Sequence, residues 1–158
     1  MSSDGSTLLF GALPAELRLS REEKRTLKAF FDDLCNRVAN HHSVICLIAG
    51  DHTLQRLNAQ FLGRDYPTDV LSFPSGNEGG VLGDVVISVQ RAAAQAAEFG
   101  HTRMDEIRIL MLHGVLHLTG LDHERDQGEM ARAEQTWRAA LGLPIALTER
   151  TGLEAAHP

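Results

Sequence analysis

The chain has 158 residues, of which 43% are hydrophobic and 23% are charged, with a formal net charge of −6. This composition is typical of an ordinary globular protein, and we expect residues 1–158 to form one domain without a broad cationic surface for duplex nucleic acid. There is neither an apolar run near the roughly 20 residues that span a bilayer nor a secretory signal pattern at the N-terminus. We therefore expect a cytoplasmic protein with no membrane partner.

The first half of the chain predicts two strands and two helices. Ser20 and Glu23 have the spacing of a capping box, and apolar residues then follow helical spacing to about Ala39. The run VICLIA, residues 44–49, is short, continuous and rich in β-branched residues, so we expect a strand covered on both faces. The other two elements are a first strand over Thr7–Phe10 and a short helix over residues 53–61, with Leu54, Leu57 and Phe61 directed inward.

The second half predicts further strands and a strongly apolar helix. Thr102 and Asp105 resemble a second capping box, which begins an apolar helix through Leu118. The other elements are strands over residues 70–73 and 84–89, helices over residues 88–99 and 127–141, and a loosely ordered tail after Pro144. These elements predict an α+β fold, a mixed α/β layer in which a small mixed sheet of about four strands packs with four to five helices.

The most informative segment is HGVLHLTGLDH, which begins at His113. His113 and His117 are four residues apart on the predicted helix, so their imidazoles project from one face and can share one ion. Gly120 is suited to end this helix in the left-handed conformation, which lets Leu121 fold back and returns His123 toward the other two histidines. A lone histidine on an apolar helix is usually a hydrogen-bonded core residue, but three in this arrangement favour a metal site on a central helix and the turn after it. Three imidazoles leave a fourth position for water, as in a catalytic zinc site; nickel, copper and iron stay open on ligand type.

The same spacing occurs in the HExxHxxGxxH site of the metzincin peptidases, with one difference. In those enzymes the residue after the first histidine is the glutamate that acts as general base. Here that residue is Gly114, which has no side chain. An ordinary peptidase is therefore disfavoured, and either another residue supplies the base or the metal alone lowers the pKa of its water.

Three motifs together resemble the YbeY-type rRNA maturation endoribonucleases: HGVLHLTGLDH, PTDVLSFP at residues 67–74 and LGDVVIS at residues 82–88. The resemblance covers roughly residues 44–142. It implies a cytoplasmic, zinc-dependent, single-strand-specific endoribonuclease with one zinc ion on His113, His117 and His123. It further implies a role in small-subunit rRNA 3′-end maturation and in ribosome assembly and quality control. The implied partners are single-stranded RNA, the small-subunit rRNA precursor and the ribosome or ribosomal proteins.

One position departs from the family pattern. Family members commonly carry an arginine in a [FY]RG[KR]D stretch before PTDVLSF, and Leu62 occupies that position here. Arg64 is the candidate to replace it as a catalytic cation. The alternative is that Arg64 is simply a solvated surface residue. Two other functions stay open: a zinc-containing ribosome-assembly factor that binds RNA without cutting it, and another zinc hydrolase such as a peptidase or amidase. Asp122 is a candidate hydrogen-bond acceptor for a ligand histidine, or simply a turn residue.

Overall fold

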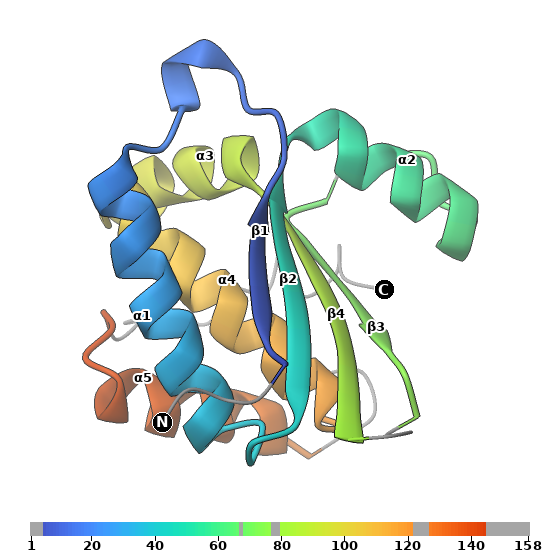
Figure 1. The fold of residues 1–158 in the computed structure, drawn as a ribbon, viewed down its shortest axis with the longest axis vertical. Helices are drawn as coiled ribbons and strands as arrows, with labels where there is room; N and C mark the ends of the chain where they lie inside the picture. Colours follow the sequence, from blue (N-terminus) through green and yellow to red (C-terminus); the bar gives the residue numbers. More distant parts are fainter. Residues whose placement is uncertain (1–4, 67, 77–79, 122–126, 145–158) are drawn as a thin grey trace.

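The computed structural model describes residues 5–66, 68–76, 80–121 and 127–144. Strands and helices alternate irregularly along this part of the chain (Figure 1). The elements are β1 (Thr7–Phe10), the 3-10 helix η1 (Ala15–Leu17), α1 (Arg21–Arg37), β2 (Ser43–Ala49), α2 (Asp51–Leu62), β3 (Val70–Pro74), β4 (Val81–Ser88), α3 (Val89–Phe99), α4 (Arg103–Leu118) and α5 (Glu129–Ala140).

The four strands form one mixed sheet in the order β1-β2-β4-β3. β1, β2 and β4 are parallel neighbours, whereas β3 pairs antiparallel with β4 at the edge of the sheet. In this register Leu8 lies opposite Cys46, Cys46 opposite Val85, and Val85 opposite Ser72. The predicted α+β fold with a small mixed sheet is confirmed.

The helices cover the two faces of the sheet unequally. In Figure 1, α1, α3, α4 and α5 lie on one side of the sheet and α2 lies on the other. α2 packs against β3 and β4, where Leu54 joins Leu71 and Val86 in a small apolar cluster. α2 covers only the carboxyl end of β2, where Ala49 joins the same cluster. Ile45, nearer the start of the strand, is 40% exposed, although Cys46 is fully buried against the larger helical layer. The expectation that this strand is covered on both faces is therefore wrong at Ile45 and holds at its carboxyl end, where Ile48 and Ala49 are both buried.

Two further expectations need correction. Phe61 was expected to point inward, but it is 59% exposed and only touches the edge of Phe73, at a ring-centroid distance of 5.6 Å. It lies in the last turn of α2, beyond the part of that helix that packs closely on the sheet. β4 begins at Val81 and not at residue 84, because its first residues already pair with β2 through Ser43.

The long helices begin where their capping residues predict. Ser20 and Glu23 form a complete capping box at α1, and the Thr102 hydroxyl accepts a hydrogen bond from the Asp105 backbone N–H at 3.0 Å at α4. α4 is the central helix, buried on nearly all sides by α1, α3, α5 and the sheet.

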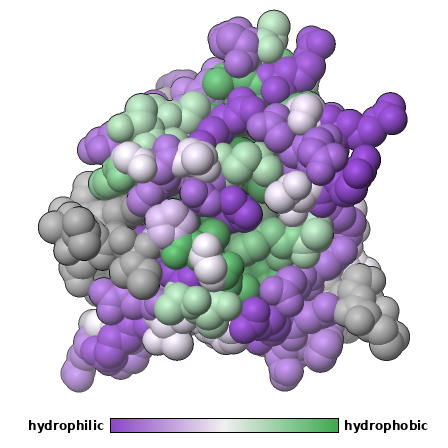
Figure 2. All heavy atoms as spheres, turned by 90° about the vertical axis from the view of Figure 1, so that its left-hand side faces the viewer, coloured by the Kyte–Doolittle hydropathy of each residue, from purple (hydrophilic) through white to green (hydrophobic). Residues whose placement is uncertain are grey.

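Hydrophilic side chains cover most of the outer helical face, with apolar side chains gathered near its middle (Figure 2). No helix in the described part of the chain is long and apolar enough to cross a bilayer. The tail expected after Pro144 lies outside the described residues.

Candidate functional site

Two of the three predicted metal ligands come together on α4. His113 is 6% exposed and His117 is half-buried, and their Nε2 atoms lie 3.1 Å apart. Two nitrogens bound to one tetrahedral zinc, each at about 2.0–2.1 Å, are separated by about 3.3 Å. The pair therefore fits a shared zinc ion.

The third predicted ligand, His123, lies outside the described residues, as does Asp122. Within the ranges that the structure describes, no group of three or more His, Cys, Asp or Glu side chains is placed to hold a metal. The described part of the site thus consists of two converging imidazoles and the groups that hold them.

α4 ends in the turn that its sequence predicts. Gly120 has a φ of 104°, a left-handed conformation that favours glycine. Its N–H donates to the carbonyl of His117 at 3.0 Å, and the Leu121 N–H donates to the carbonyl of Leu116 at 3.4 Å. These two hydrogen bonds form a Schellman motif, so the chain reverses three residues after His117.

Gly114 allows α4 to approach the sheet closely. A Cβ at this position would lie 2.6 Å from Val85 Cγ1 and 3.3 Å from Ser72 Oγ, and Ser72 Oγ donates to the Gly114 carbonyl at 3.0 Å. A side chain at residue 114 would point into the sheet and not toward the histidines. The general base that metzincins carry at the equivalent position therefore has no space here.

One residue of the site, Glu134, was not predicted from the sequence. Glu134 of α5 is only 14% exposed, and its Oε1 contacts Nδ1 of His113. The Arg138 guanidinium lies 3.7 Å from the other carboxylate oxygen of Glu134. A sequence signal for this contact exists, because Glu134 is four residues after the buried Met130 and three before Trp137, on the apolar side of the helix.

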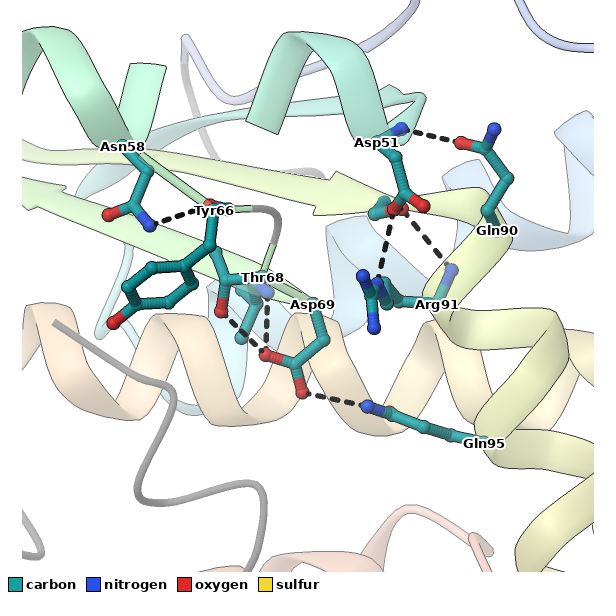
Figure 3. Close-up of polar contacts among 10 residues, drawn as sticks. Asp51, Asn58, Tyr66, Thr68, Asp69, Gln90, Arg91 and Gln95 are labelled. Carbon is teal, nitrogen blue, oxygen red and sulfur yellow. Dashed lines mark hydrogen bonds and ion pairs between the residues drawn. The ribbon is translucent and has the colours of Figure 1, made fainter. Parts of the chain in front are cut away.

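The loop that carries Arg64 is anchored at both ends (Figure 3). At its start the Arg64 backbone N–H donates to the Asn58 carbonyl, and in its middle the Tyr66 carbonyl accepts from the Asn58 amide at 2.9 Å. At its end the buried Asp69 carboxylate accepts a hydrogen bond from the Gln95 amide of α3 at 3.3 Å. Thr68 is also buried, and its hydroxyl donates to Asp69. Thr68 therefore contributes a hydrogen bond at the end of the loop.

Leu62 and Arg64 lie on either side of Gly63, the residue that caps the end of α2. Leu62 is the last residue of the helix and is 37% exposed. Gly63 follows in the left-handed conformation, and the half-buried Arg64 donates its backbone N–H to the Asn58 carbonyl at 3.2 Å. The turn at Gly63 thus separates the two residues, and the catalytic role of Arg64 stays a prediction.

A second polar cluster joins the beginnings of α2 and α3 (Figure 3). The Asp51 carboxylate accepts a hydrogen bond from Ser88 Oγ at 2.6 Å and lies 3.4 Å from Arg91 Nε. The Gln90 side chain accepts a hydrogen bond from the Asp51 backbone N–H. These contacts link the carboxyl ends of β2 and β4, which precede the two helices.

The chain is similar to known proteins over most of its length. The family model described as "Endoribonuclease YbeY" matches residues 16–142. Endoribonuclease YbeY of Solibacter usitatus is 53% identical over 94% of this chain and 97% of its own. Its counterpart in Helicobacter pylori strain 26695 is 40% identical over 76% of this chain and 86% of its own. The solution structure of TM1509 from Thermotoga maritima is similar with a TM-score of 0.60 and 26% identity, over 85% of this chain and 88% of that one. The chain therefore belongs to the YbeY family of endoribonucleases.

Proposed function

We propose that this chain is a zinc-dependent, single-strand-specific endoribonuclease that acts in small-subunit rRNA 3′-end maturation and in ribosome assembly and quality control. Family membership supports the endoribonuclease activity. The observation that carries the proposal is the convergence of the His113 and His117 Nε2 atoms at 3.1 Å. This separation is close to the roughly 3.3 Å expected between two nitrogens on one tetrahedral zinc, so a shared ion suits the geometry.

The metal would be held by His113, His117 and the predicted third ligand His123. Zinc, when bound, supplies a Lewis acid for a phosphate oxygen and lowers the pKa of a water toward 7. The chain itself fixes the two imidazoles on a buried helix whose position is set by the contact of Gly114 with the sheet. Because residue 114 is glycine, it cannot act as the general base.

Arg64 is our proposed cation for the scissile phosphate. A guanidinium near the reacting phosphorus offsets the negative charge that develops in the transition state. The hydrogen bonds of Asn58 and Asp69 hold the loop that carries Arg64 at both ends, so the loop can present the side chain without a large ordering cost.

The substrate we propose is single-stranded RNA of the small-subunit rRNA precursor. Its bases can be splayed out and its backbone is accessible in a small site, unlike those of a duplex. A net charge of −6 also fits poorly with broad duplex binding. The ribosome or its proteins would be the partners, in the cytoplasm.

The test is cleavage of a 3′-extended small-subunit rRNA precursor by zinc-loaded protein, beside the same segment annealed to a complementary strand. We expect cuts in the single-stranded extension alone, and Arg64→Ala should lower the rate while Arg56→Ala, at an exposed position on α2, should not. Equal cutting of both substrates would contradict single-strand specificity. Ribosome association without any cleavage would instead favour an assembly factor, and 2′,3′-cyclic phosphate ends would indicate attack by the 2′-hydroxyl.

A further inference from the structure

His113 has two ring nitrogens with different tasks in the proposed site. Nε2 faces His117 and needs a lone pair to bind a metal, which requires the proton of the neutral ring to sit on Nδ1. A metal-binding histidine generally keeps that proton in place by donating it to a neighbouring acceptor. The tautomer of His113 thus decides whether Nε2 can act as a ligand.

The acceptor at Nδ1 is the carboxylate of Glu134. It comes from a different helix, 21 residues farther along the chain, and its contact with His113 is largely buried. Arg138, one turn farther along α5, is 5% exposed and lies 3.7 Å from the outer carboxylate oxygen of Glu134. A buried carboxylate is costly without compensation, and the guanidinium supplies an opposite charge.

We infer that Glu134 is the positioning residue of the site, which holds the His113 ring in the orientation and tautomer that leave Nε2 available to the metal. The inference rests on the proposed zinc site. It makes zinc affinity depend on the packing of α5 on α4, although Glu134 itself is not proposed as a ligand. A solely structural role would stabilise the two helices without selecting a tautomer.

The test compares Glu134→Gln and Glu134→Ala with the wild type. Glu98→Gln, which removes the same charge at an exposed position of α3, is the matched control. Zinc affinity is measured by competition with a chelator, and the His113 tautomer is read from long-range ¹H–¹⁵N NMR correlations in the metal-free protein. Far-UV circular dichroism shows whether each variant is folded.

We expect the proton on Nδ1 in the wild type and in Glu98→Gln, and a shift toward Nε2 in Glu134→Ala. Zinc affinity should fall about 10–100-fold in Glu134→Ala and less in Glu134→Gln, whose amide oxygen still accepts a hydrogen bond. If the wild type binds zinc and the folded variants match Glu98→Gln in affinity and tautomer, the inference is overturned and the proposed function stands. If the wild type binds no zinc, the proposed function fails and the inference fails with it. Because Glu134→Gln keeps the size of the side chain, it provides a folded variant even if Glu134→Ala does not fold.

Discussion

Replacing Gly114 by alanine tests how closely α4 must approach the sheet. The added Cβ would lie 2.6 Å from Val85 Cγ1 and 3.2 Å from Val85 Cγ2, whereas favourable carbon contacts are about 3.5–4.0 Å. The helix must therefore move by up to about 1 Å, and overpacking of this kind costs about 1–3 kcal/mol. Alanine also gains about 1 kcal/mol over glycine inside a helix, so we expect a net destabilisation of about 0–2 kcal/mol.

The two opposing effects can be separated with a double-mutant cycle. Urea unfolding would be measured for Gly114→Ala, Val85→Ala and the double variant. Because Val85→Ala removes both clashing methyl groups, the double variant should be more stable than the sum of the single changes predicts, by about 1 kcal/mol or more. Additive changes, or a Gly114→Ala protein that is more stable than the wild type by the full helix-propensity gain, would refute the close-contact explanation.

Two further predictions concern stability and the anchored loop. The backbone hydrogen bond with Ser20 holds the pKa of Glu23 below its ordinary 4.5, so ionised Glu23 stabilises the fold above about pH 4.5, and this contribution is lost as the pH falls through the folded-state pKa. Glu23→Gln should therefore be less stable than the wild type in urea at pH 7, and the difference should be smaller at pH 3. An equal difference at both pH values would contradict this reasoning. Asp69→Ala removes the buried acceptor of the Gln95 amide and should cost about 1–3 kcal/mol. It should also slow RNA cleavage, because the loop before β3 loses its anchor; an unchanged rate in a measurably destabilised variant would contradict the second part.

Local signals in the sequence predicted the ends of the helices well. The capping box of Ser20 with Glu23, the Thr102 cap and the turn at Gly120 all involve residues within a few positions of one another. Such contacts form wherever the helix itself forms, so the local sequence is sufficient to predict them. The order of strands and helices and the α+β class followed from the same local patterns.

Burial that depends on the packing of separate elements was predicted less well. Ile45 and Phe61 are apolar and fit a buried pattern, yet both are exposed because α2 covers only part of its sheet face. Residue patterns along one element do not show how far a neighbouring helix extends over it. The exposure of both residues depends on the packing of separate elements.

In the site, too, contacts within one helix were predicted from the sequence and contacts between separate elements were not. The spacing of His113 and His117 on one helix face was sufficient to predict their convergence, which the structure confirms. The contact of Glu134 with His113 joins residues 21 positions apart on two helices, whereas the sequence pointed only to Asp122 for such a role. The sequence shows that Gly114 departs from the metzincin pattern. The proximity of Val85 and Ser72, which excludes a side chain there, depends on the packing of α4 on the sheet and is not visible in the sequence.

The central claim is that one zinc ion on the converging histidines is required for RNA cleavage. The most direct measurement adds zinc stepwise to metal-free protein while bound zinc and cleavage of the single-stranded rRNA precursor are both followed. We predict that cleavage rises from none to a plateau at one zinc per chain. His117→Ala should stay inactive at every zinc concentration, whereas His52→Ala, at an exposed position of α2, should follow the wild type. Full cleavage by the metal-free protein, or by His117→Ala, would contradict the claim.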